Sequence, residues 1–365
     1  MRILFITERP YLPQQIGGRE MVIHETVQEL LRMGHKPFIM SGLEPGNWFF
    51  VKNRLLCKLT NNEYPMDCDL GYPVYRGWSW ESGLADIIGK IKPDVAVVES
   101  TALKFLDTLR LLGVPAALRL HDTALHALGG DPRQYSDCQF IAVSSYLADR
   151  FQEKFSFRPT VIPPLVRRER CMANPTRKKI VFVNPRPVKG GDIAISVARN
   201  CPDIPFTFFQ AWTLDSQVIE LMKQAKSLRN VEWRSPVMDA KEIYKDAHTM
   251  LIPSRADETW GRIATEAHFN GIPVIASRRG GLVESVGPGG ILLEPTASAE
   301  QWTEATRNIW NDPKYYAELS QSALQFSCRH DISERAIMGQ FMMVLEQVTA
   351  ENSRVSGRHY VPHPS

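Results

Sequence analysis

The sequence predicts two α/β domains, each a parallel sheet with helices on both faces, on three observations. The chain has 365 residues, which is the length of two ordinary domains. Short apolar runs alternate with amphipathic stretches in two separate series, and this alternation is typical of a doubly wound parallel sheet. A segment rich in proline and arginine, residues 159–179, lies between the two series. We therefore expect two Rossmann-like domains joined by this segment.

The first series contains five apolar runs that are predicted to be buried strands. After the first of them, residues 19–33 carry an apolar helical face, and Gly34 is expected to end this helix in the left-handed conformation. Ser144 or Ser145 is expected to cap the helix that follows the fifth run. The five predicted strands are residues 2–7, 36–40, 94–98, 116–120 and 139–143.

The second series predicts six strands and ends in a helix from residue 332 to about 349 that is strongly apolar on one side. The strands are residues 179–183, 206–209, 231–233, 249–252, 273–276 and 290–293. The predicted organisation is a first domain over residues 1–165, a linker over 166–178, a second domain over 179–331, a C-terminal helix over 332–352 that braces the first domain, and a mobile tail over 353–365.

Composition excludes several classes of protein. A net charge of +3 on this length does not indicate a nucleic-acid binder. The six cysteines form no Cys-x-x-Cys pair, and the nine histidines form no zinc-ligand cluster, so reduced thiols and no metal cofactor are expected. The apolar run at the N-terminus is too short for a secretion signal, and no stretch approaches the roughly 20 apolar residues of a membrane span. We expect a cytoplasmic protein whose contact with membranes is limited to its surface.

The most informative stretch runs from residue 254 to 284, from the end of an apolar strand into a helix. Glu258 and Glu266 are separated by seven residues, which is about two helical turns. Gly261 is expected in the first turn, where the backbone comes close to a ligand. Backbone N–H groups at a helix start bind phosphate well, so a diphosphate is the predicted ligand of Thr259, Trp260, Gly261, Arg262 and Ile263. Glu258 then lies at the sugar end of the ligand, and Glu266 accepts hydrogen bonds from ribose hydroxyls.

This stretch resembles the donor motif of the retaining glycosyltransferases of family 4. The matching residues are Glu258, Gly261, Glu266, Ala267, Gly271, Pro273 and Val274. The resemblance implies a B-type fold of two Rossmann-like domains facing across a cleft, with the acceptor against the first domain and the donor in the second. It also implies a nucleotide-diphosphate sugar donor, an acceptor that is a small molecule, a glycan or a lipid-linked molecule, retention of configuration, and no obligatory metal.

Four shorter motifs occur in the family's order. Gly17 and Gly18 resemble its first glycine loop, although a bare glycine pair is more often a turn. His121 follows a predicted strand, where the family has a histidine that reaches the donor sugar; the alternative is an ordinary loop histidine. The remaining motifs are Arg186 with Lys189, which would neutralise the diphosphate or form a solvated basic loop, and Gly281 with Leu282, a turn that can approach the donor.

The sequence also departs from the family pattern. The spacer between Arg186 and Lys189 is short, which makes Lys189 the safer match. Arg262 replaces an aliphatic residue, and it either adds a donor contact or faces solvent.

The sequence contains two further segments with a possible function, and three other functions suit the same fold. Asp67 and Asp69 spell a metal-binding pattern that is easily matched by chance. Residues 48–59 mix aromatic, aliphatic and basic side chains, and we expect their apolar side to pack into the core rather than to lie on an anionic membrane. The alternatives to sugar transfer are a nucleotide-sugar epimerase, a pseudo-glycosyltransferase, and a non-catalytic binding protein of the same fold.

Overall fold

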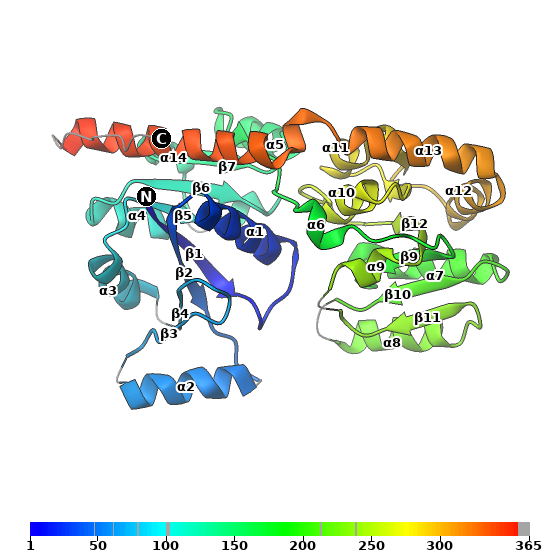
Figure 1. The fold of residues 1–365 in the computed structure, drawn as a ribbon, viewed down its shortest axis with the longest axis horizontal. Helices are drawn as coiled ribbons and strands as arrows, with labels where there is room; N and C mark the ends of the chain where they lie inside the picture. Colours follow the sequence, from blue (N-terminus) through cyan, green and yellow to red (C-terminus); the bar gives the residue numbers. More distant parts are fainter. Residues whose placement is uncertain are drawn as a thin grey trace. The chain divides into compact units, whose positions relative to one another are not determined.

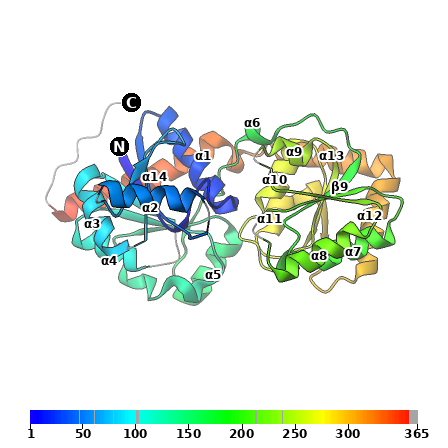
Figure 2. The same ribbon diagram turned by 90° about the horizontal axis from the view of Figure 1, so that it is seen from below.

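The computed structural model describes residues 1–46, 48–60, 62–78, 80–99, 103–211, 214–237 and 239–356. The chain forms two compact units, which Figures 1 and 2 show in two views. Unit 1 contains Met1–Pro163 together with residues 335–356, and unit 2 contains Pro164–Glu334. Each unit has its own parallel sheet and its own apolar core. The predicted pair of Rossmann-like domains is confirmed.

Unit 1 is built on an eight-stranded sheet in the order β3-β4-β2-β1-β5-β6-β7-β8 (Figure 1). Every neighbouring pair is parallel except β3 with β4, which is antiparallel. All five predicted strands are present. The sequence did not predict β3 and β8, which are two residues long, or β4, whose four residues include the charged Arg76. The strands are β1 (Arg2–Pro10), β2 (Lys36–Gly42), β3 (Met66–Asp67), β4 (Val74–Gly77), β5 (Val95–Val98), β6 (Ala116–Leu120), β7 (Gln139–Ala142) and β8 (Thr160–Val161).

The helices of unit 1 begin and end at the signals that the sequence carries. Gly34 follows α1 with a φ of 81°, and Ser144 caps α5 by accepting a hydrogen bond from the backbone N–H of Leu147 at 3.1 Å. The helices are α1 (Gly18–Arg32), α2 (Trp48–Thr60), α3 (Trp80–Ile91), α4 (Lys104–Leu111) and α5 (Ser145–Phe155), with 3-10 turns η1 (Leu125–Leu128) and η2 (Pro132–Gln134).

The last helix, α14 (Glu334–Ser356), packs on unit 1. Its Phe341 stacks on Phe5 of β1, with the ring centroids 6.4 Å apart. The helix begins two residues later than expected and continues to Ser356. It therefore includes residues 353–356 of the predicted tail, and residues 357–365 lie outside the described part of the chain.

Unit 2 has a six-stranded, fully parallel sheet in the order β11-β10-β9-β12-β13-β14. The chain moves outward from β9 to β11 and then crosses back to β12, so the direction of winding reverses between β9 and β12. In such sheets a ligand binds beyond the carboxyl ends of the strands at this reversal. All six predicted strands are present: β9 (Lys179–Val183), β10 (Phe206–Phe209), β11 (Val231–Arg234), β12 (Ala247–Ile252), β13 (Val274–Ser277) and β14 (Gly290–Leu293).

The helices of unit 2 cover both faces of this sheet (Figure 2), with α7 and α8 on one face and α10 on the other. The helices are α6 (Arg168–Cys171), α7 (Gly191–Asn200), α8 (Ser216–Lys226), α9 (Lys241–Tyr244), α10 (Arg262–Phe269), α11 (Leu282–Val286), α12 (Ala299–Asn311) and α13 (Pro313–Phe326). Two 3-10 turns, η3 (Pro187–Lys189) and η4 (Gly287–Gly289), precede α7 and β14, and a third, η5 (His330–Ile332), precedes α14.

The segment predicted as a linker, residues 166–178, contains α6 and is bound to unit 2. The side chain of Asn270 accepts a hydrogen bond from the backbone N–H of Ala173 at 2.7 Å and donates to the carbonyl of Cys171 at 3.0 Å. The first boundary between the units accordingly falls at Pro163 and Pro164, before this segment.

Residues 48–59 do not pack as predicted. They belong to α2, and four of their apolar side chains are at least half exposed: Trp48 (78%), Leu59 (74%), Leu55 (55%) and Val51 (50%). The expectation that this apolar side packs into the core is wrong. Across the part of the chain that the structure describes, no helix combines the length and apolar character needed to cross a bilayer.

Candidate functional site

Two loops of unit 2 meet beyond the carboxyl ends of β9 and β12, where the winding reverses. The carbonyl of Val188 accepts hydrogen bonds from the backbone N–H groups of Arg255 at 3.0 Å and Ala256 at 3.2 Å. Gly190 has a φ of 78°, and a Cβ atom at this position would overlap the carbonyl oxygen of Pro253. Only glycine allows this approach, so the pairing of the two loops is built into the backbone.

The loop contact brings together two predicted residues, Lys189 and Glu258. The Nζ of Lys189 lies 2.6 Å from Oε1 of Glu258, and the hydroxyl of Ser254 donates to the same oxygen at 2.9 Å. Both charged side chains are partly exposed, 23% for Lys189 and 19% for Glu258. A cation and a carboxylate therefore lie side by side at the reversal point, and both are partly open to solvent.

Helix α10 begins directly after this pair. Gly261 is its N-cap with a φ of 92°, so the helix starts at Arg262 and Glu258 lies in the loop before it rather than within the helix. The first N–H groups of a helix have no partner within the helix. Their dipoles favour an anion, and the helix starts four residues after Glu258, the partner of Lys189.

The turn at Gly280 and Gly281 holds this loop in position. The backbone N–H of Gly281 donates to the carbonyl of Glu258 at 2.7 Å, and a Cβ atom at position 281 would overlap the carbonyl oxygen of Thr259. A Cβ atom on Gly261 would lie 2.5 Å from Cδ2 of Leu282. Gly261 and Gly281, which were expected to approach a donor, thus also pack closely within unit 2. Gly281 contacts the loop before α10, residues 254–261, which we call the donor loop.

Glu266 lies on α10 in a network that the sequence did not indicate. Its Oε2 accepts a hydrogen bond from the hydroxyl of Tyr244 at 2.5 Å, and its Oε1 accepts one from Nε of Arg262 at 3.3 Å. Burial, and then the charge of Glu266, raises the pKa of Tyr244 well above its usual value, so this phenol is a permanent donor. The carboxylate is therefore fixed in one orientation.

Arg262 does not face solvent, which was one of the two roles expected for it. Its guanidinium pairs with Glu266 and donates to the carbonyl of Leu165 at 2.7 Å, and its side chain is only 10% exposed. It fastens the start of α10 to the segment that begins unit 2.

The other residues predicted to bind the donor differ in their exposure and in their hydrogen-bond partners. Trp260 is 4% exposed, and its indole N–H donates to Thr265 at 3.0 Å, so its side chain belongs to the packing of unit 2. Thr259 and Ile263 are partly exposed. Arg186 pairs with Asp215, the N-cap of α8, with its Nη1 2.6 Å from Oδ2 of that residue.

Unit 1 contains a second charged cluster, around His121 at the end of β6. The Nε2 of His121 lies 2.5 Å from Oε2 of Glu99, which follows β5, and the same carboxylate receives three hydrogen bonds from Arg119. Burial raises the pKa of Glu99, but the charge of Arg119 and the hydrogen bonds outweigh it and lower the value to about 2. Burial lowers the pKa of His121, so the imidazole is neutral at pH 7. Since Glu99 can only accept, Nε2 carries the proton and Nδ1 is an acceptor.

Glu99 and Arg119 were not identified from the sequence. Two signals in the sequence could have found them: a carboxylate directly after the buried run Val95–Val98, and an arginine within the buried strand β6. A buried charge needs a partner.

The predicted glycine loop lies at the start of α1. Gly17 is the N-cap of α1 and Gly18 its first residue, and the following Arg19 and Glu20 pair with each other at 2.9 Å.

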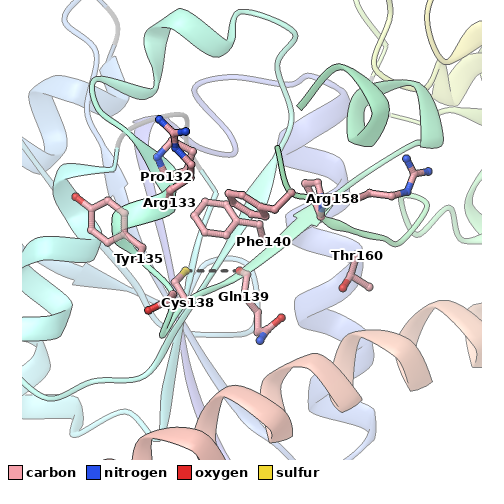
Figure 3. A pocket seen from close by; sticks show the side chains of 11 residues that line it. Pro132, Arg133, Tyr135, Cys138, Gln139, Phe140, Arg158 and Thr160 are labelled. Carbon is pink, nitrogen blue, oxygen red and sulfur yellow. Dashed lines mark hydrogen bonds between the residues drawn. The ribbon is translucent and has the colours of Figure 1, made fainter. Parts of the chain in front are cut away.

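A cavity of about 320 Å³ in unit 1 lies away from this cluster (Figure 3). It is bounded by Tyr135, Phe140 and Arg158 among others, at the beginnings of β7 and β8. Because β6, β7 and β8 are parallel, this is the opposite edge of the sheet from His121.

Asp67 and Asp69 have separate partners. Asp67 accepts from the buried Arg76 at 2.6 Å, and Asp69 pairs with Lys52 at 3.3 Å. Within the described ranges, no three His, Cys, Asp or Glu side chains are grouped as metal ligands would be.

Residues 168–326 match the sequence model of the family described as Glycosyl transferases group 1. The matched residues are less than half of the chain, so the similarity to this family is a similarity of one segment. The match covers most of unit 2 and includes Lys189, Glu258 and Glu266.

Solved structures resemble the whole chain. HepE from Anabaena, crystallised with UDP and glucose, superimposes with a TM-score of 0.73 at 18% identity, covering 95% of this chain and 100% of HepE. Sucrose-phosphate synthase from Thermosynechococcus elongatus gives 0.73 at 16% identity, covering 96% and 99%. The chain has the GT-B fold of glycosyltransferases.

Curated relatives match shorter stretches. A D-inositol 3-phosphate glycosyltransferase from Catenulispora acidiphila is 36% identical over 106 residues, 28% of this chain and 25% of its own length. A protein of the same description from Saccharomonospora viridis is 34% identical over 93 residues, 25% of this chain and 21% of its own length. The matched stretches thus span a quarter or less of these two relatives.

Proposed function

We propose that this protein transfers a sugar from a nucleotide-diphosphate sugar to an acceptor hydroxyl, with retention of configuration and without a metal, as in glycosyltransferase family 4. The observation that carries the proposal is the Lys189–Glu258 pair beside the start of α10, at the reversal point of a parallel sheet. HepE, of the same fold, was crystallised with UDP and with UDP-glucose.

In this proposal the donor diphosphate lies over the first turn of α10 and against Lys189. Negative charge develops on the diphosphate as the bond to the sugar breaks. A fixed ammonium group and oriented N–H groups stabilise that charge without reorganising, which lowers the barrier. Glu258 accepts hydrogen bonds from sugar hydroxyls, and Glu266, held by Tyr244 and Arg262, accepts them from the ribose.

Unit 1 contributes His121 in its neutral form. With Nε2–H directed to Glu99, the free Nδ1 can accept a hydrogen bond from a hydroxyl of the donor sugar. Arg119 balances the charge of Glu99, so the imidazole is oriented without being protonated.

A cytoplasmic location belongs to the proposal, because all six cysteines are free thiols. A glycan, a small molecule or a lipid-linked molecule can serve as the acceptor.

The test is a donor panel. Uridine, guanosine and adenosine diphosphates are added singly to the full chain, and the shift of the melting temperature is measured. One diphosphate should stabilise the protein, since a ligand that binds only the folded state shifts the equilibrium by mass action. The matching nucleotide sugars are then scored by release of diphosphate and by the anomeric configuration of the product.

Lys189→Ala serves as the control in the same panel, because it removes the proposed phosphate contact and lies outside the core. Stabilisation that persists unchanged in this variant would contradict the proposed donor site. A free epimerised sugar, or diphosphate binding without any turnover across the panel, would contradict transfer and support one of the other functions of this fold.

A further inference from the structure

An apolar stripe runs along the outer surface of α2. Trp48, Val51, Leu55 and Leu59 follow one another at intervals of three, four and four residues, which places them in one row on a helix. Each is at least half exposed, and Trp48 and Leu59 are about three-quarters exposed. Large apolar side chains gathered in one row on a surface mark a contact with another body.

The opposite side of α2 is anchored to unit 1. Asn53 is buried, with its side chain donating to the carbonyl of Phe49 at 2.9 Å. The guanidinium of the buried Arg76 lies 4.8 Å from the ring centre of Phe49, and Phe50 packs edge-on against Trp78 at 5.4 Å. These contacts fix the rotation of the helix, so the stripe faces outward. In Figure 1, α2 lies beyond the edge of the sheet formed by β3 and β4.

Three exposed cations border the stripe. Successive residues of a helix are about 100° apart, which puts Lys52 on one side of the stripe and Arg54 and Lys58 on the other. The helix contains no acidic residue, and Lys52 pairs with Asp69 at 3.3 Å. The exposed surface of α2 is therefore apolar at its centre and positive along both borders.

This charge pattern selects among possible partners. A second copy of the same surface would bring like charges together, which opposes self-association. An anionic bilayer complements both parts of the surface, because a helix in the interface buries its apolar row while lysine and arginine side chains reach the headgroups on either side. Tryptophan at the end of such a row is favoured at the headgroup level.

We propose that α2 binds unit 1 to the surface of an anionic lipid bilayer, with Trp48, Val51, Leu55 and Leu59 inserted between headgroups. The proposal is independent of the donor site, because α2 contains none of the residues assigned to that site, neither those of unit 2 nor His121 of unit 1. It assigns a role to a segment that the glycosyl transferase match, residues 168–326, does not reach.

Flotation with vesicles tests the proposal on the full chain. The protein should float with vesicles that contain phosphatidylglycerol and not with vesicles of phosphatidylcholine alone, and added salt should weaken binding. Leu55→Glu should lower the ratio of bound to free protein by about tenfold or more, because it replaces an inserted leucine with a charge. The matched control is Leu111→Glu, at a position 87% exposed on α4 of the same unit, which should float as the wild type does.

A charge variant tests the borders of the stripe separately. Lys58→Gln should weaken binding by about fivefold at low salt, and Lys226→Gln on α8 should not change it. Emission from Trp48 should shift to the blue on binding, and Trp48→Phe should remove that part of the shift.

Each alternative result overturns the proposal. Wild-type protein that fails to float with anionic vesicles, or Leu55→Glu protein that floats as well as the wild type, contradicts membrane binding by α2. Equal flotation with neutral vesicles contradicts the role of the cations. A wild-type dimer that Leu55→Glu dissociates, without vesicle binding, identifies the stripe as a protein interface. Circular dichroism and stabilisation by nucleoside diphosphate show that the variants are folded.

Discussion

The ammonium group of Lys189 lies 2.6 Å from the carboxylate of Glu258, although 69 positions separate the two residues. The pair forms because the loops after β9 and β12 share backbone hydrogen bonds through Val188. Each charge neutralises the other here. In the proposed complex a phosphate takes the place of Glu258 beside Lys189, and sugar hydroxyls take the place of Lys189 beside Glu258.

The first prediction concerns Lys189. Lys189→Ala should lower turnover by about a hundredfold to a thousandfold, because it removes a fixed cation from the developing charge of the diphosphate. Lys189→Arg should restore only part of the rate, since the guanidinium is larger and planar. Initial rates and circular dichroism measure the two effects. Arg255→Ala is the matched control, since Arg255 lies on the adjoining loop and pairs with Asp192. A normal rate for Lys189→Ala would remove this residue from the mechanism.

The second prediction separates the two glutamates. Glu266→Ala should weaken binding of the free nucleoside diphosphate by about tenfold to a hundredfold, since it removes a charged acceptor for the ribose. Glu258→Ala should lower turnover with a smaller effect on this affinity, because its proposed partner is the sugar. Titration calorimetry with the diphosphate alone measures both.

Tyr244→Phe controls for the network around Glu266. It removes the hydrogen bond to the carboxylate while leaving the carboxylate in place, so its effect on affinity should be smaller than that of Glu266→Ala. Equal loss of affinity in the Glu258 and Glu266 variants would refute the division of roles.

The third prediction concerns Gly281, whose φ of −67° suits any residue. Its constraint is close approach, because a Cβ atom would overlap the carbonyl oxygen of Thr259. Gly281→Ala should destabilise the protein by about 1–3 kcal/mol and reduce donor affinity, since the donor loop must move. Gly339→Ala is the control: this exposed helix position has no atom within 4 Å of the added Cβ, and alanine there should stabilise by about 0.5–1 kcal/mol. Thermal unfolding compares the two, and equal melting temperatures would contradict the packing argument.

The fourth prediction is a loss of stability in acid. Burial lowers the pKa of His268, on α10, to about 4, and that of His248, on β12, to about 4. Below pH 6.5 the unfolded chain binds protons that the folded protein does not, so the stability falls as the pH falls from 6.5 towards 4. For His268 the loss reaches about 3 kcal/mol at pH 4. His268→Leu should therefore flatten the dependence of the melting temperature on pH, and an unchanged slope would contradict it.

Much of the fold could be predicted from the sequence because buried parallel strands are short continuous apolar runs. The strand β9 is Lys-Ile-Val-Phe-Val, and β10 and β13 are likewise mostly apolar and buried, whereas β11, Val-Glu-Trp-Arg, is only partly buried. By contrast, β4 is four residues long and contains the buried Arg76, whose partner Asp67 lies on another strand, so no local pattern indicated it.

The sequence indicated the motif residues of the candidate site, but not the side chains that pair with them. The motif from Glu258 to Glu266 lies on contiguous residues, whereas the partners Tyr244 and Glu99 come from other elements and only the fold brings them close. The sequence also could not predict which face of α2 is exposed. A helix with aromatic residues all round can bury either side, and the contacts of Phe49 and Asn53 decide which.

The last prediction is that turnover survives a strong chelator. The proposed charge on the diphosphate is met by Lys189 and by the first N–H groups of α10, which together supply what a divalent ion supplies in other transferases. Asp67 and Asp69, the one acidic pattern of the metal-binding type, are paired with Arg76 and Lys52. Rates measured before and after exhaustive chelation should agree within about twofold, a change that corresponds to less than 1 kcal/mol in the barrier. Asp69→Asn, at an exposed position, should leave the rate unchanged as well. If chelation abolishes turnover and manganese or magnesium restores it, the charge on the leaving group is met by an ion, and the loss in Lys189→Ala must then be attributed to binding rather than to the step in which the bond breaks.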